Sequence, residues 1–224
     1  NSAVDVVSAN NSGVPSSGSW SLCAWINVLS LTGIRQDIFG VNWTPTNSTI
    51  SVGATGFYVL NDPIGLVSTT MRAPIGTMIP VVTTWDATNA RGCMYANGFL
   101  IYTRTGTPTA FTDGKIITGR FAFSAAQPAF AYVGRRRVFA REVTPAEVMA
   151  WSRDNIEPSS SNLRAQYDLL TGSGSTDVDT SGNANNGTIT GATWFNQRIY
   201  TARTATTNRT SATNRTTATN RVEL

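Results

Sequence analysis

The sequence predicts an all-β protein, an antiparallel β-sandwich of the jelly-roll type with one short helix and an extended C-terminal tail. Short segments of alternating or β-branched residues recur along the chain, and Gly, Pro, Asn and Asp separate them. Apolar residues make up 41% of the chain, which is enough for a core. The length of 224 residues suits one large all-β domain, or one such domain followed by a tail.

Strands are expected wherever this alternation appears. The clearest segment places Leu22, Ala24 and Ile26 on one face, and Cys23 and Trp25 on the other. The expected strands are 20–28, 38–42, 49–52, 56–60, 65–71, 78–85, 92–96, 99–103, 115–119, 132–140 and 163–169.

One short helix is expected near 145–154. Thr144 supplies an N-cap hydroxyl, Pro145 occupies the first helical position and Glu147 the third, which is the pattern of a capping box. Val148 and Trp151 give the helix a short apolar face. Because so short a helix is marginal alone, we expect it to pack on the edge of the sandwich.

The composition excludes several kinds of chemistry. The chain has no histidine, which removes Ser-His-Asp and Cys-His catalysis and histidine metal sites, and two cysteines cannot build a zinc site. No window approaches the 18 apolar residues of a membrane helix. Since the chain opens at Asn1 without a charged leader, we expect any signal peptide to have been removed. The polar, Lys-poor composition favours an extracellular or particle-surface location.

The tail, 198–224, carries the whole net charge of +4. Its arginines recur every six residues, and nine threonines in 201–224 favour an extended form that would align these arginines on one face. The repeating residues are Arg203, Arg209, Arg215 and Arg221. Such a tail either docks on other subunits or an acidic partner, or is a solubilising segment that is disordered in a monomer.

Four motifs resemble laminin-G-like domains of the concanavalin A-like lectin/glucanase superfamily. They are 21–26 (SLCAWI), the hairpin formed by 81–86 (VVTTWD) and 94–98 (MYANG), the strand and helix start at 137–147 (RVFAREVTPAE), and the pair 172–176 (GSGST) with 179–188 (DTSGNANNGT). The resemblance implies one sandwich over 1–197. It also implies that the chain could hold a glycan.

The chain departs from the family pattern in two places. The 179–188 motif normally opens such a domain but here follows the helix, so 163–197 is a permuted segment, the start of a second unit, or a strand that completes a neighbouring subunit. Gly134 stands where the family often has an Asp, which weakens a calcium role there.

Two binding sites are candidates. Trp43 and Asn42, in a loop rich in turn residues, are the candidate glycan contacts. Asp177, Asp179, Ser181 and Asn183 have the spacing of the first half of a calcium loop, which makes calcium the only cofactor that the sequence suggests. The alternative for this loop is an Asx turn that bonds its own backbone.

The cysteines and arginines each allow two interpretations. The family arrangement would bring Cys23 near Cys93, so these residues form a disulfide or remain two buried free thiols. The run 135–137 (RRR) is either an anionic-ligand patch or a solvated face whose guanidiniums pair with carboxylates. Alternation along a strand favours the second, because Arg136 points away from its neighbours.

The leading functional hypothesis is a non-enzymatic structural surface protein. It would be a virion decoration or appendage protein, or an extracellular filament subunit, with the tail binding other subunits or a capsid or filament partner. The alternative is a carbohydrate-binding adhesion module, assisted by calcium. An enzyme is not expected, since no strand presents two carboxylates on one face as a glucanase requires. Nucleic-acid binding is weaker still, because no aromatic residue interleaves with the tail arginines after Tyr200.

Overall fold

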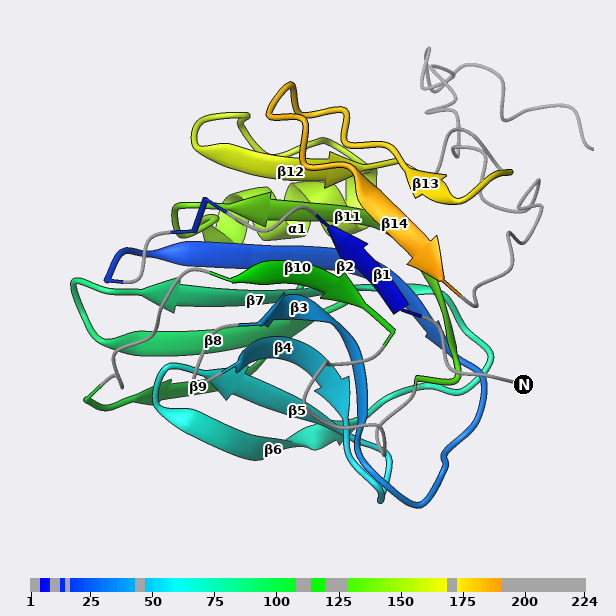
Figure 1. Cartoon of the computed structure of the whole chain (residues 1–224). Helices are drawn as coiled ribbons and strands as arrows, with labels where there is room; N and C mark the ends of the chain where they lie inside the picture. Colours follow the sequence, from blue (N-terminus) through cyan, green and yellow to red (C-terminus); the bar gives the residue numbers. More distant parts are fainter. Residues whose placement is uncertain are drawn as a thin grey trace, which may run out of the picture.

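The computed structural model describes residues 5–8, 13–14, 17–42, 47–107, 114–119, 129–168 and 173–190. Two antiparallel sheets pack together and one short helix lies against them, which confirms the predicted sandwich (Figure 1). The repeat tail at 198–224 lies outside the described residues, and so do Trp43 and the side chain of Asn42.

The larger sheet has eight strands. Neighbouring strands pair antiparallel throughout. Their order is β13 (Thr176–Asp177), β14 (Gly187–Thr190), β1 (Asp5–Ser8), β10 (Lys115–Thr118), β3 (Gln36–Asn42), β4 (Asn47–Val52), β5 (Phe57–Asp62) and β6 (Gly65–Arg72).

The smaller sheet has six strands, which are also antiparallel. Asn97 and Gly98, at φ 52° and 84°, make the tight turn between two of them, which is the conformation an Asn-Gly hairpin favours. The order is β12 (Leu163–Tyr167), β11 (Ala131–Phe139), β2 (Trp20–Val28), β7 (Ile79–Asp86), β8 (Arg91–Ala96) and β9 (Phe99–Thr105).

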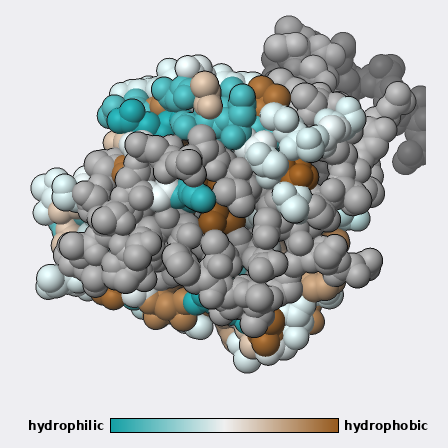
Figure 2. Space-filling view, viewed as in Figure 1, coloured by the Kyte–Doolittle hydropathy of each residue, from teal (hydrophilic) through white to brown (hydrophobic). Residues whose placement is uncertain are grey.

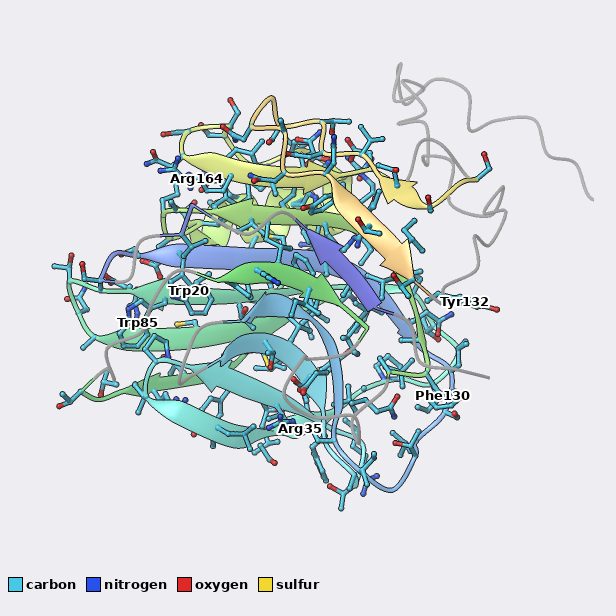
Figure 3. All side chains as sticks on the ribbon, viewed as in Figure 1. Trp20, Arg35, Trp85, Phe130, Tyr132 and Arg164 are labelled. Carbon is cyan, nitrogen blue, oxygen red and sulfur yellow. The ribbon has the colours of Figure 1, made fainter. Side chains whose placement is uncertain are left out.

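The main core lies between the two sheets. As the alternation predicts, Leu22, Ala24 and Ile26 point into it from β2 and are buried. Trp20 and Trp85 are directly paired across β2 and β7 and are both buried at one end of this core (Figure 3).

The disulfide interpretation of Cys23 and Cys93 is wrong. Both cysteines are free and buried, because β7 lies between β2 and β8: Cys23 pairs with Val82, while Cys93 pairs with Thr84. Strands two apart in a sheet are separated by roughly 9.5 Å, beyond the reach of a disulfide. Burial raises the pKa of the Cys23 thiol to about 12, so this thiol is unreactive.

The helix, α1 (Pro145–Asp154), begins with the predicted capping box. The Thr144 hydroxyl accepts from the Glu147 amide, and the Glu147 carboxylate accepts from the Thr144 amide. The helix does not pack on the sandwich edge. It packs on the outer face of the six-stranded sheet, where Val148 and Trp151 join a second apolar cluster with Cys23. No helix of the described residues is long and apolar enough to cross a membrane.

The described parts of the C-terminal segment, 163–168 and 173–190, belong to the same sandwich as the other described strands. β12 pairs with β11, and β14 pairs with β1 through the register Val6↔Ile189. The first and last described strands are therefore neighbours, as a permuted order of strands requires. The strands β1, β13 and β14 were not predicted from the sequence, because each has four residues or fewer.

Candidate functional site

Of the two predicted glycan contacts, Asn42 lies at the end of β3. Asn42 ends β3, where it pairs with Asn47 of β4 on one side and Lys115 of β10 on the other. Only its backbone is described, and Trp43 lies outside the described residues. The assignment of Asn42 and Trp43 as glycan contacts therefore stays a prediction.

A buried polar network runs across β3 and β4. Arg35 makes a bidentate ion pair with Asp37, with Nε and Nη2 each 3.0 Å from a carboxylate oxygen. The Ser51 hydroxyl donates to Asp37 at 2.6 Å, and Thr49 lies 2.6 Å from Ser51. Because Ser51 gives its one proton to Asp37, Thr49 donates to Ser51.

This network faces away from the main core. Ile50 and Val52 of β4 point into that core, so Thr49 and Ser51, which alternate with them, point to the outer face of the eight-stranded sheet. Figure 3 shows Arg35 beside this sheet. The network fixes β3, the strand that ends at Asn42. Sequence analysis missed it, although polar residues at alternate positions of a predicted strand are a usable signal.

The side chains of the candidate calcium loop bind other protein groups. Asp177 is 1% exposed and makes an ion pair at 2.5 Å with the buried guanidinium of Arg136. Asp179 accepts bonds of 2.9 Å from the amides of Gln166, Ser181 and Asn185 and from the Ser181 hydroxyl. The Ser181 hydroxyl also contacts Asn183, whose amide group donates to the carbonyl of Leu163 at 2.9 Å.

This geometry favours the Asx-turn interpretation of the loop. Asp177 and Asp179 point to different partners, and no three His, Cys, Asp or Glu residues of the described segments gather as a metal site would require. Calcium binding by Asp177, Asp179, Ser181 and Asn183 stays a prediction, and a bound ion would have to compete with these protein partners. Figure 2 shows hydrophilic residues gathered along the upper edge of the molecule, over β12.

The three consecutive arginines of β11 all have carboxylate partners. Arg136 points between the sheets to Asp177 and Thr118, and its guanidinium lies 5.0 Å from the Tyr167 ring. Arg137 points to the opposite face and binds Glu157 and Asp168. Arg135 binds the same two acids.

The predicted pairing and alternation of these arginines are therefore confirmed. The predicted solvation is wrong for Arg136 and Arg137, because both side chains are only 2% exposed. A buried, paired guanidinium cannot form an anionic-ligand patch.

The buried tryptophans are structural. Trp20, Trp85 and Trp151 are at most 2% exposed, as expected for core residues. Trp25 is partly buried, and its ring meets that of Trp151 edge-on at 5.8 Å. Trp194 lies outside the described residues.

The described carboxyl groups with a shifted pKa have that pKa lowered, whereas a general acid of a glycosidase needs a raised pKa. Hydrogen bonding to Asn89 lowers the pKa of Asp86, and bonding to Arg141 lowers that of Glu147 to about 2. Burial would raise the pKa of Asp168, but bonds from Gln166 and Arg137 lower it.

The fold is that of a lectin-like sandwich, and the sequence agrees. Residues 1–149 match the profile of the concanavalin A-like lectin/glucanases superfamily. The chain belongs to this superfamily. No curated protein sequence matches it.

Several solved structures share the fold. A Bacteroides ovatus protein with a proposed role in carbohydrate binding is 18% identical, with a TM-score of 0.68 over 84% of this chain and 56% of that one. The heptameric SAP-like pentraxin of Limulus polyphemus is 14% identical, with a TM-score of 0.53 over 69% and 77%. Trypanosoma rangeli sialidase is 14% identical, with a TM-score of 0.52 over 62% and 23%. The chain thus spans about half of the first protein and a quarter of the sialidase.

Proposed function

We propose that the chain is a non-enzymatic carbohydrate-binding module that acts outside the cell or on the surface of a particle. The observation that carries this proposal is membership of the lectin/glucanase superfamily, together with a likeness to a carbohydrate-binding candidate over most of the chain. The lack of histidine and the lowered pKa values of Asp86, Glu147 and Asp168 support a binding role over a hydrolytic one.

A glycan array probed with the full chain tests this function. We expect binding to one class of glycans, unchanged by a calcium chelator, because Asp177 and Asp179 already have protein partners. Binding that disappears with the chelator would restore the calcium prediction. An array without signal, with or without calcium, would remove the carbohydrate-binding function.

The proposed role of the tail in assembly is supported by fewer observations than the proposed carbohydrate binding. It rests on the arginine repeat at 203–221, while the likeness to a heptameric pentraxin concerns the sandwich alone. We propose that the tail mediates self-association. Light scattering on the full chain and on a chain ending at Gln197 tests this: only the full chain should form oligomers, and equal masses would remove the role.

A further inference from the structure

Part of the outer face of the six-stranded sheet is not covered by α1. The helix covers the end that contains Cys23, Val82 and Tyr95. Beyond it, the face continues to exposed apolar side chains, with Leu29 41% and Phe130 37% exposed. We call this uncovered region the aromatic strip and define it by Asn27, Leu29, Phe130 and Tyr132.

The register of β2 and β11 aligns these residues. Tyr132 pairs directly with Asn27, and the Leu29 amide donates to the Phe130 carbonyl at 2.8 Å one step further on. Ala131 points to the main core, so Phe130 and Tyr132 on either side of it point outward, about 6.6 Å apart along the strand. Figure 3 shows both at the same end of the sandwich.

The strip is held rigidly from behind. The side chain of the fully buried Gln36 accepts the Phe130 amide at 2.7 Å and donates to the Ser30 carbonyl at 2.9 Å. The parallel bridge between Val28 and Ile75 fixes the neighbouring loop. An aromatic ring on a backbone fixed in this way loses little conformational entropy when it binds a ligand.

One polar group of the strip has no hydrogen-bond partner among the described residues. It is the Oδ1 atom of Asn27, a residue that is 6% exposed. A buried acceptor without a partner destabilises the fold. Because Asn27 pairs directly with Tyr132, this acceptor lies beside an aromatic residue, and a sugar needs both, since its hydroxyls require hydrogen bonds and its C–H face packs on a ring.

The strip is uncharged. The nearest guanidinium along β11, that of Arg135, already binds Glu157, Asp168 and the Asn155 side chain. No described member of the strip could select an acidic sugar by its charge.

We propose that the aromatic strip is a binding surface for a neutral saccharide, with Phe130 and Tyr132 as stacking rings and Asn27 as the hydrogen-bonding group. This deepens the proposed carbohydrate-binding function by naming its face and its class of sugar. It places the contact on the opposite sheet from Asn42.

Affinity electrophoresis of the full chain tests the strip. Native gels would contain mannan, laminarin or galactan, with alginate as the charged counterpart. We expect retardation by a neutral polysaccharide, at least about tenfold weaker binding for Tyr132→Ala and Phe130→Ala, and near-normal binding for Tyr132→Phe, which keeps the ring. Phe99→Ala is the matched control, because Phe99 is an exposed aromatic residue on the distant β9 edge.

The outcomes separate the strip from the general function. If Tyr132→Ala and Phe130→Ala are retarded as strongly as the wild-type chain, or if only Trp43→Ala loses retardation, the strip is not the binding surface. Carbohydrate binding by the chain would still stand. Retardation by alginate alone would overturn the neutral class. No retardation by any polysaccharide, with a blank glycan array, would overturn both proposals.

One further variant distinguishes a binding role from a folding role. Asn27→Leu removes the amide, whose oxygen has no described partner, while it keeps the volume of the side chain. We expect weaker polysaccharide binding by a chain that melts at a higher temperature. If binding is lost only together with a lowered melting temperature, the effect is on folding and the role of Asn27 is refuted.

Discussion

The two halves of the outer face of the six-stranded sheet are built differently. Under α1 the face is closed: Cys23, Val82 and Trp151 are buried, and the helix start is fixed by its capping box. In the aromatic strip the face is open, with exposed Leu29 and Phe130 beside the Asn27 amide, whose oxygen has no partner in the described segments. The closed half shows that burial under α1 stabilises this sheet. The open half carries exposed apolar side chains and a buried oxygen without a partner, neither of which stabilises the fold.

The largest expected effect is on the closed half. Trp151→Ala should lower the free energy of unfolding by about 3–5 kcal/mol, because it removes the largest apolar group that α1 buries. Urea unfolding followed by circular dichroism measures this. Ile156→Ala, at a residue that is 58% exposed just after the helix, should change stability by less than about 0.5 kcal/mol. Equal effects of the two variants would show that α1 is not anchored through Trp151.

A smaller effect is expected at the start of α1. The Glu147 carboxylate accepts from Arg141 at 2.7 Å and from the amides of Thr144 and Ser159 at 2.9 and 3.0 Å. Removing its charge in Glu147→Gln, which keeps an acceptor for the Thr144 amide, should cost about 1 kcal/mol at pH 7 through the weakened pairing with Arg141. Asp154→Asn, at the other helix end, should cost far less.

The effect of Glu147→Gln should depend on pH. Bonding to Arg141 lowers the pKa of Glu147 from 4.5 to about 2 in the folded chain. Because the folded value lies below the unfolded one, the carboxylate stabilises the fold above about pH 4.5, and this contribution is lost as the pH falls toward 2. Thermal unfolding at pH 7 and pH 2.5 should show the two chains converging. A constant difference would point to a lost contact that does not involve charge.

The smallest effect should have the opposite sign. Asn27→Leu should raise the free energy of unfolding by about 1 kcal/mol, because an apolar side chain of similar size replaces a buried amide whose oxygen has no partner in the described part of the chain. Chemical denaturation measures it. A loss of stability would mean that the amide contributes to folding, and the contrast between the two halves would disappear.

Local patterns were predictable from the sequence. β2 has the predicted bounds, and the Thr144–Glu147 capping box forms as predicted, since both depend on neighbouring residues alone. β1 and β14 were missed because each has four residues and gains its stability from a partner far away in the chain.

The candidate site was less predictable, because the same acidic and hydroxyl side chains can either bind an ion or bind other groups of the protein. The acids and hydroxyls of 177–183 have the spacing of a calcium loop, yet Asp177 binds Arg136, which lies 41 residues earlier. No sequence motif marks Asn27 or Tyr132 as a functional residue, since each lies in an ordinary strand pattern. Only the pairing of β2 with β11 brings them together.

The pairing of β1 with β14 also has a topological consequence. Asp5 lies directly opposite Thr190, so the chain comes into the sandwich and goes out of it at one corner. A domain whose two ends are adjacent can be inserted into a loop of another protein without moving the flanking segments of that loop apart. The sandwich would then be attached to its host at one point on its surface.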